Sequence, residues 1–476
     1  MLYSLDGLEL RRKHAFPTFI KRPKTREVAL QKSPDDLVAL LEGGALTRRR
    51  LIQGLMAVLG PAAVTIRARA TVAFQQSTAT SANDVVPYGP EIIASGVRSR
   101  FVNDINGLRM HILEAGFEVK DRPAILLLHG FPELAYSWRK VMLPIASAGF
   151  HVIAPDRRGY GRTSSWDVDY DDDLDPFGTL NQVRDILGLV SALGYRSVAA
   201  VIGHDQGSPI AAWGAVVRPD VFRSVVMMSS PFAGPPALPF NTADTTQAKA
   251  AVDHIYEDLA ALNPPRKYYQ QYYMTRPAND NMWHPPQGVH AFLRAYYHMK
   301  SADWKQNAPF PLKARTASEW AKLPRYYVMD LDKGMAETVA PEMPSAAAIA
   351  TCKWLPEDEL RVYSTEYGRT GFQGGLNGYR VRWGGKDTSE LRLFSGRTIN
   401  VPSLFIGGQS DWGVYQTPGE FEKMQKTACT RMLGAQLVEG AGHWVQQEQP
   451  GEVSKLLMQF LKDKAQHQNR LIRTDA

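Results

Sequence analysis

The chain has 476 residues, which is long enough for a large hydrophobic core and for more than one domain. Its 44% hydrophobic and 22% charged residues are typical of an ordinary globular protein. The formal net charge of +7 comes from the first 70 residues, because the rest of the chain carries 42 basic and 42 acidic residues. A nucleic-acid-binding protein carries a basic face on its folded domain, so we do not expect this function.

The basic N-terminal segment is typical of an export leader. Arg48 and Arg49 precede an apolar run over residues 54–66, and small residues alternate over residues 67–73. This order is typical of a twin-arginine signal. We therefore expect residues 1–80 to be a leader and the protein to be periplasmic or secreted, with a cytoplasmic location as the alternative.

The apolar run of the leader is shorter than the roughly 20 residues that span a membrane, so we expect no stable membrane insertion. Residues 1–46 are long for the part that precedes such a signal, and a start codon further downstream would explain them. Whether the leader is cleaved stays open at this point.

The body begins with a run of strand signals. Residues 99–116 predict two strands joined by the turn Asn106–Gly107, a strong hairpin signal. Residues 124–130 and 150–156 are short continuous apolar strands of the kind that are covered on both faces of a sheet. Residues 180–194 have helical periodicity and end at a glycine.

Strand and helix then alternate. Residues 199–217 predict a buried strand, a turn and a helix, and residues 222–230 predict another strand. Residues 401–411 and 434–443 are further strands, and a closing helix covers residues 451–463. The alternation predicts an α/β fold with a mostly parallel central sheet and helices on both faces.

A segment of different composition interrupts this alternation. It is rich in Pro, Tyr, Trp and Gly and has weak strand signals, which indicates a helical insertion. We therefore expect a leader, a core in two parts and a cap, with these boundaries: leader 1–80, core 97–232, cap 233–397 and core 398–470.

Three predicted strand ends carry titratable side chains. Asp205 lies between Gly203 and Gly207 in the small-x-nucleophile-x-small pattern of a hydrolase turn, and Asp411 and His443 follow later strands. The carboxyl ends of parallel strands meet at one edge of a sheet. The order nucleophile, acid, histidine is that of the α/β-hydrolase triad.

A carboxylate nucleophile suits attack on saturated carbon, because it is already ionised and forms an ester whose carbonyl belongs to the protein. His443 would then activate water and Asp411 would hold the imidazole tautomer. The backbone N–H groups of Gln206 and Phe131 would stabilise the charge on the ester oxygen. An esterase would instead need serine at position 205.

The sequence leaves competing interpretations open. A single aspartate between glycines is commonly a turn residue or a helix N-cap. A non-catalytic binding protein of the same fold is another alternative, although such a protein would be expected to have lost members of the triad.

The chain resembles the epoxide hydrolases of the α/β-hydrolase fold. The resemblance extends over about residues 97–465 and lies in these segments: 126–138, 154–164, 203–207, 375–380, 407–414 and 440–450. It implies a helical cap with two tyrosines that donate hydrogen bonds to the epoxide oxygen. Tyr379 matches the second cap tyrosine, and Tyr269 is the best match for the first, with Tyr268 and Tyr272 as alternatives. In and beside these segments we assign the following residues to substrate binding: His129, Pro132, Trp138, Tyr273 and Trp412.

Two positions depart from the family pattern. Gln206 and Gly378 stand where the family commonly has aromatic residues, which predicts a roomier or more polar substrate site. A haloalkane or haloacid dehalogenase of the same fold is the alternative activity. However, Phe131 and Gln206 stand where the haloalkane enzymes typically have an asparagine and a tryptophan that bind halide, and Gln206 cannot replace the arginine that holds the substrate carboxylate in the haloacid type. The triad and water suffice for the chemistry, so neither a metal nor an organic cofactor is implied. Pairing of Cys352 with Cys429 and the oligomeric state stay open.

Overall fold

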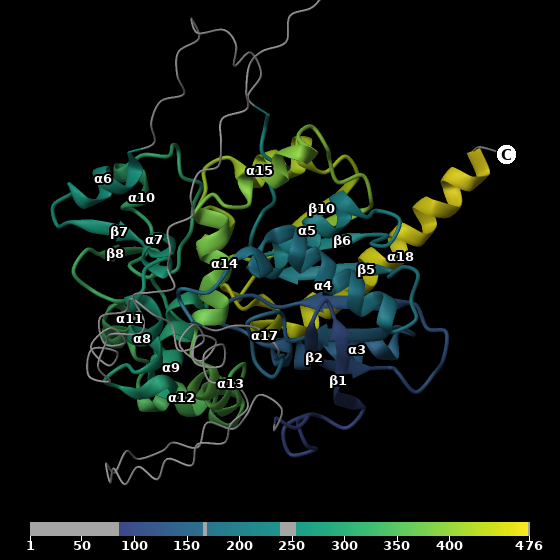
Figure 1. Cartoon of the computed structure of the whole chain (residues 1–476), viewed down its shortest axis with the longest axis horizontal. Coiled ribbons are helices and arrows are strands. Elements are labelled where there is room, and N and C mark those ends of the chain that lie inside the picture. The colour runs from purple at the N-terminus through teal and green to yellow at the C-terminus, as the bar shows by residue number, and fades with distance from the viewer. Residues whose placement is uncertain (1–84, 165–168, 239–253, 475–476) are drawn as a thin grey trace, which may run out of the picture. The chain divides into compact units, whose positions relative to one another are not determined.

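A computed structural model describes residues 85–164, 169–238 and 254–474, and Figure 1 shows its fold. The predicted leader, residues 1–80, lies outside the described residues, so a twin-arginine signal and export stay predictions.

The large sheet of the described chain has eight strands in the order β1-β2-β4-β3-β5-β6-β9-β10. β1 is antiparallel to β2 and β2 to β4, and the other neighbouring strands are parallel. The chain places β4 on one side of β3 and β5 on the other, so strand order reverses between β3 and β5. Ligands bind at such a switch point. The strands are β1 Val97–Ile105, β2 Leu108–Ala115, β3 Ala124–Leu128, β4 His151–Pro155, β5 Ala200–His204, β6 Val225–Met228, β9 Ser403–Gly408 and β10 Met432–Val438.

The predicted hairpin is confirmed. β1 and β2 pair across the turn Asn106–Gly107, where both residues have positive φ values of 50° and 82°. Asparagine and glycine tolerate this backbone conformation better than other residues, which is why the pair marks the turn in the sequence.

The parallel strands are buried on both faces, as their continuous apolar sequences predict. Leu127 of β3 packs into one hydrophobic cluster, while its neighbours Leu126 and Leu128 pack into another. Alternate strand residues point to opposite faces, so the two clusters lie on the two sides of the sheet.

Helices cover both faces of the sheet, which confirms the predicted fold class. Residues of α4 and α5 pack into the cluster that contains Leu126, and residues of α3 and α18 pack into the cluster that contains Leu127. The helical elements of the core are η1 Ala135–Trp138, α3 Arg139–Ser147, η2 Asp175–Phe177, α4 Thr179–Ala192, α5 Gly207–Val217, η5 Trp412–Val414, α16 Glu420–Lys423, η6 Met424–Ala428, α17 Val445–Glu448 and α18 Pro450–Thr474.

A mainly helical cap is inserted between β6 and β9, and in Figure 1 α14 stands between most of its elements and the sheet. Its helices are α6 Ile255–Ala260, α7 Tyr269–Tyr273, α8 Pro277–Trp283, α9 Gly288–Lys300, α10 Ala317–Trp320, α11 Met335–Val339, η3 Ala340–Glu342, α12 Ala346–Thr351, α13 Glu357–Thr370, α14 Gln373–Trp383, α15 Thr388–Leu391 and η4 Arg392–Phe394.

The cap also contains a two-stranded antiparallel sheet that the sequence did not predict. It consists of β7 Arg266–Tyr268 and β8 Val328–Asp330, each of which has only three residues. Periodicity needs longer segments to identify a strand. This small sheet leads directly into α7, so it positions the start of the tyrosine-rich helix.

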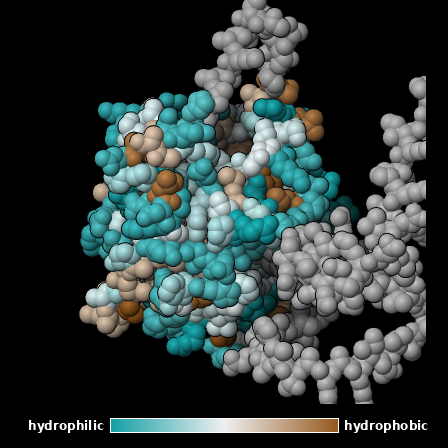
Figure 2. All heavy atoms as spheres, turned by 60° about the vertical axis from the view of Figure 1, so that its left-hand side comes forward, coloured by the Kyte–Doolittle hydropathy of each residue, from teal (hydrophilic) through white to brown (hydrophobic). Residues whose placement is uncertain are grey.

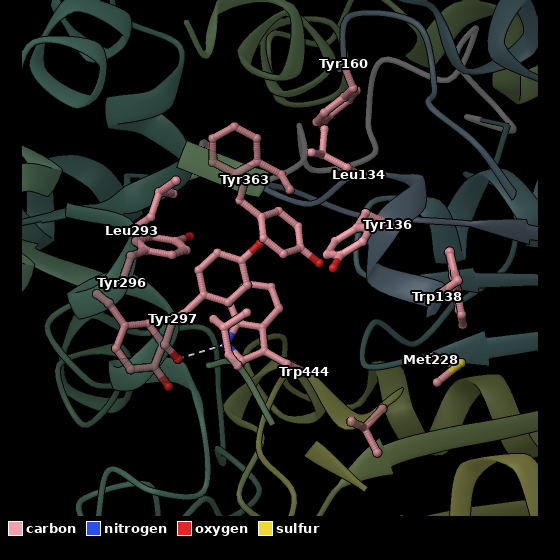
Figure 3. Close-up of a cluster of buried hydrophobic side chains, with 14 of the residues drawn as sticks. Leu134, Tyr136, Trp138, Tyr160, Met228, Leu293, Tyr296, Tyr297, Tyr363 and Trp444 are labelled. Carbon is pink, nitrogen blue, oxygen red and sulfur yellow. Dashed lines mark hydrogen bonds between the residues drawn. The ribbon is translucent and has the colours of Figure 1, made fainter. Parts of the chain in front are cut away.

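Aromatic side chains join the cap to the core (Figure 3). The ring of Tyr297 from α9 stacks on Trp444 at a centroid distance of 4.3 Å, and Trp444 Nε1 donates a hydrogen bond of 2.9 Å to the Tyr297 carbonyl. Tyr363 from α13 packs against Tyr297 and Tyr136. Two cap helices are thereby fixed next to the loop that carries His443.

The outer surface shows no large apolar face in the view of Figure 2, where hydrophobic side chains lie in small groups among hydrophilic ones. Among the described helices, none is long and apolar enough to cross a membrane. Cys352 and Cys429 are both free thiols, so they do not form a disulfide with each other.

Candidate active site

Asp205 occupies a tight turn between β5 and α5, with a φ of 50°. A positive φ is strained for a residue other than glycine. The glycines on either side are required sterically. A Cβ at Gly203 would lie 2.1 Å from the Gly207 carbonyl oxygen, and a Cβ at Gly207 would lie 2.2 Å from the Leu128 carbonyl oxygen. The turn therefore lifts the Asp205 side chain out of the packed sheet.

The Asp205 carboxylate is held by the loop that follows β3. The backbone N–H of Phe131 donates a hydrogen bond of 2.8 Å to Oδ1. Gln206 is the residue directly before α5, and its N–H has no acceptor among the described residues, as is usual at the start of a helix. These two N–H groups are the predicted oxyanion hole, and the structure places both beside Asp205.

The structure brings Asp411 and His443 to Asp205. Nε2 of His443 lies 3.5 Å from Oδ2 of Asp205, and Nδ1 lies 3.1 Å from Oδ1 of Asp411. Asp411 Oδ1 also accepts a hydrogen bond of 2.7 Å from the Gly413 N–H. Nε2 of His443 is buried without a hydrogen-bond partner in the described chain, so it is free to contact a water molecule or a ligand.

Both aspartates are ionised at neutral pH. Burial opposes ionisation of Asp205, but its interactions with His443, Lys300 and His204 outweigh burial and hold its pKa well below the usual range. Burial likewise opposes ionisation of Asp411, and His443, Ser229 and the Gly413 N–H lower its pKa. About 12% of the Asp205 side chain is exposed, so this charged carboxylate remains accessible to a small molecule.

The cap supplies two tyrosines to the cavity above Asp205. Tyr269 comes from α7 and Tyr379 from α14. Burial and neighbouring phenols, together with Asp205, raise the pKa of each hydroxyl well above its ordinary value, so both stay protonated. The Tyr269 hydroxyl accepts a hydrogen bond of 2.8 Å from Gln270 Nε2 and lies 3.4 Å from Gln416 Oε1. The Tyr379 hydroxyl makes no hydrogen bond to a described residue.

The cavity has a mixed apolar and polar wall. Besides Asp205, Gln206, Tyr269 and Tyr379 it is lined by Arg157, Phe177, Thr179, Gln182, Pro209, Ile210, Trp213, Ser230, Gln270, Gly378, Arg382, Trp383, Leu391, Gln416, Thr417 and Glu420. Tyr268 and Tyr272, the two alternatives for the first cap tyrosine, are not part of this wall.

Five residues that we assigned to substrate binding lie outside the cavity wall. His129 is buried, its Nε2 accepts from the Arg157 N–H, and burial lowers its pKa to about 4. The Pro132 carbonyl accepts from the Tyr297 hydroxyl. These two residues hold the loop after β3 in place, and their substrate-binding role stays a prediction.

The other three of the five are aromatic packing residues in this structure. Trp138 is fully buried in the aromatic core, where Figure 3 shows it well away from the Tyr297–Trp444 pair. The Tyr273 hydroxyl donates to Tyr296, and the Trp412 ring packs against Phe310. The structure does not bring these side chains to the cavity, because their apolar surface is used inside the fold.

The sequence analysis missed Ser229. It follows β6 with a φ of 68°, donates from Oγ to Asp411 Oδ2, and has Oγ 2.8 Å from His443 Nδ1. A sequence signal for Ser229 was available. Residues 222–230 were predicted as a strand, and Asp205, Asp411 and His443 had been identified as titratable residues at strand ends.

A buried ion pair behind the nucleophile was also missed. Glu133 Oε2 lies 2.6 Å from His204 Nδ1, and His204 Nε2 lies 2.7 Å from the His443 carbonyl oxygen. Burial opposes both charges, yet each partner shifts the other, so the pKa of His204 is raised and that of Glu133 is lowered. The pair connects three segments: the loop after β3, the end of strand β5 and the loop that carries His443.

The fold and site together define an α/β hydrolase with a carboxylate at the nucleophile position. A sequence profile described as the alpha/beta hydrolase fold matches residues 123–267. The chain is 31% identical over 375 residues to epoxide hydrolase A of Mycobacterium tuberculosis, an alignment that covers 75% of this chain and 95% of that protein. It is 30% identical to an epoxide hydrolase of Caballeronia sordidicola, with 75% and 92% covered.

The solved structure of an epoxide hydrolase from an endophytic Streptomyces is also similar. It aligns with a TM-score of 0.61 and 31% identity, and covers 77% of this chain and 96% of that chain. The protein therefore belongs to the epoxide hydrolases of the α/β-hydrolase fold.

Proposed function

We propose that this protein hydrolyses an epoxide to a vicinal diol through an ester on Asp205. The observation that carries the proposal is the position of one ionised carboxylate. Asp205 lies 3.5 Å from the free Nε2 of His443, accepts a hydrogen bond from Phe131, and opens into the cavity that contains Tyr269 and Tyr379.

In the first step, Oδ2 of Asp205 attacks one epoxide carbon and the bond between that carbon and the ring oxygen breaks. The ring oxygen takes the electron pair of the broken bond. Tyr269 and Tyr379 are neutral donors in the wall of the same cavity, so their hydroxyl groups stabilise this oxygen and supply its proton. The product of the step is an ester between Asp205 and the substrate carbon.

In the second step, His443 Nε2 takes a proton from water and the resulting hydroxide attacks Cγ of the Asp205 ester. Oδ1 carries the negative charge of the tetrahedral intermediate, next to the N–H groups of Phe131 and Gln206. Collapse of the intermediate breaks the bond between Cγ and the ester oxygen. The proton of the hydroxyl that was added to Cγ moves to that oxygen, which releases the diol and restores the carboxylate. The imidazolium then returns its proton to the tyrosine that lost one.

Asp411 supports the second step from the other side of the imidazole. Its carboxylate lies 3.1 Å from Nδ1 of His443, which keeps the proton on Nδ1 and leaves Nε2 free to accept one. No step requires a metal or an organic cofactor, and water is the second substrate.

A panel of epoxides with diol detection by mass spectrometry tests the proposal on the full chain. We expect diol from at least one epoxide with the wild-type protein and none with Asp205→Ala, which should retain the wild-type circular dichroism spectrum. A parallel panel of haloalkanes and haloacids is assayed for halide. Halide release without diol formation would replace epoxide hydrolysis by dehalogenation.

For the cellular location we propose export through the twin-arginine-like segment at Arg48 and Arg49, which rests on the sequence pattern. Fractionation of expressing cells tests this. Periplasmic or secreted protein is expected for the natural chain, and retention in the cytoplasm is expected when both arginines are replaced by lysine. A natural chain that stays in the cytoplasm would contradict export.

A further inference from the structure

The Gln206 side chain faces the cavity directly beside the nucleophile. Gln206 is the N-cap residue of α5, but its side chain makes no capping hydrogen bond. Its Oε1 accepts a hydrogen bond of 2.9 Å from the Tyr160 hydroxyl. Its Nε2 has no partner among the residues that the structure describes. Two amide N–H donors are therefore left over in the wall of the cavity.

Tyr160 holds the oxygen end of the Gln206 amide. The Tyr160 ring is buried and packs edge-on against His129 at a centroid distance of 4.8 Å. Burial raises the pKa of the Tyr160 phenol, so the hydroxyl keeps the proton that it donates to Oε1. Because Tyr160 donates to Oε1 in the structure, Nε2 is the end of the amide that a ligand can reach.

Gly378 packs close to the oxygen end of this amide. A Cβ at Gly378 would lie 3.3 Å from Gln206 Oε1, which is closer than most real Cβ contacts. Gly378 also precedes Tyr379 in α14. The unused N–H donors thus lie in the same cavity as the nucleophile and a cap tyrosine, where an epoxide would bind.

We propose that Gln206 Nε2 binds a neutral oxygen of the substrate, which makes the preferred substrate an epoxide whose substituent carries an ether or carbonyl oxygen. This rests on the function proposed above. A neutral acceptor is favoured over a carboxylate, because Asp205 is itself a charged carboxylate in the cavity. The buried cation of the wall, Arg157, is occupied by the His129 carbonyl and Gln182 Oε1.

A matched pair of substrates isolates this contact. Phenyl glycidyl ether carries an ether oxygen next to the carbon that bears the epoxide, and 1,2-epoxy-4-phenylbutane has CH₂ at that position. The ratio of kcat/KM for the two substrates is measured within each variant, so a change in overall rate cancels. A net hydrogen bond of ordinary strength predicts a wild-type ratio of about 3 to 10 in favour of the ether.

Gln206→Met keeps the length of the side chain and removes the donors, so its ratio should fall to about 1. Tyr160→Phe releases the amide from its fixed orientation and should lower the ratio part of the way. Gln182→Met is the matched control. Both ends of the Gln182 amide are engaged, Oε1 by Arg157 and Nε2 by the Phe177 carbonyl, so its loss should leave the ratio unchanged.

The outcomes separate this inference from the proposed function. A wild-type ratio near 1, or a ratio that Gln206→Met and Tyr160→Phe both leave unchanged, would overturn the inference while diol formation still supports epoxide hydrolysis. Absence of diol from either substrate and from the wider panel would overturn the proposed function. If Gln206→Met does not fold, Tyr160→Phe alone decides the inference.

Discussion

The hydroxyl of Ser229 contacts both the acid and the base of the triad. It donates a hydrogen bond to Asp411 Oδ2, and its oxygen lies 2.8 Å from Nδ1 of His443, closer than the 3.1 Å between Nδ1 and Asp411 Oδ1. The imidazole is therefore oriented by a carboxylate and a hydroxyl from two different strand ends.

Replacing Ser229 by alanine should lower kcat about tenfold, because Asp411 loses a charge-assisted hydrogen bond and His443 loses an orienting contact. The rate of ester formation should change little, because Asp205 needs no base. Stopped-flow kinetics separate the two rates. Ser229→Gly is the matched control, since it removes the same hydroxyl and also the strain of the positive φ. An unchanged kcat in both variants would rule out the role of the hydroxyl.

Tyr269→Phe and Tyr379→Phe should each slow ester formation on the order of 10- to 100-fold, because each removes one donor to the developing alkoxide. Rapid quench with detection of the alkylated protein measures this step. Tyr268→Phe and Tyr273→Phe are matched controls from the same cap segment that lie outside the cavity wall, and they should stay within about threefold of wild type. A larger loss in Tyr268→Phe than in Tyr269→Phe would reassign the first cap tyrosine.

Glu448 fixes the loop that carries His443. Its Oε1 accepts from the Trp444 N–H, and its Oε2 accepts from the N–H groups of Gly442 and Ala302. Glu448→Ala should slow hydrolysis of the ester more than its formation, so that the ester accumulates and becomes visible by mass spectrometry. Glu452→Ala, which removes a half-buried glutamate in the first turn of α18, should not. Equal slowing of both steps would indicate a general loss of structure instead.

The sequence predicted the central sheet well because its strands carry strong local signals. Asn106–Gly107 dictates a hairpin, and the glycines around Asp205 dictate a sharp turn through steric contacts with Gly207 and Leu128. The fold class can therefore be predicted from short segments of the chain.

The features that the sequence did not predict depend on contacts between residues that are far apart in the chain. Trp138 has the same apolar character whether it packs in the core or lines a cavity, and only the fold shows that it packs in the core. Tyr268 and Tyr269 are neighbours with the same side chain, and the turn from β7 into α7 decides which of them reaches the cavity. The strand end marks Ser229 in the sequence, but its contact with Asp411 spans 182 positions of sequence and is visible only in the fold.

Acid should destabilise the protein through Asp156. Burial would raise its pKa, but His111 and the Arg162 N–H lower it to about 2, from an ordinary value of 3.8. A carboxyl whose pKa is depressed by folding stabilises the native state above pH 4, and this stabilisation is lost as the pH falls toward 2. The loss amounts to about 2–3 kcal/mol. Urea unfolding at pH 5 and pH 3 should show a steeper loss in wild type than in Asp156→Asn, and parallel losses would contradict this assignment.

The covalent step is tested most directly by a single turnover in water enriched in oxygen-18, with enzyme in excess over epoxide. If water attacks Cγ of the Asp205 ester, the heavy oxygen remains in the protein, and mass spectrometry of the peptide that contains Asp205 should show a gain of one oxygen-18 while the first diol carries none. Label in the diol with an unlabelled Asp205 would mean that water attacks the epoxide directly, and would contradict the account.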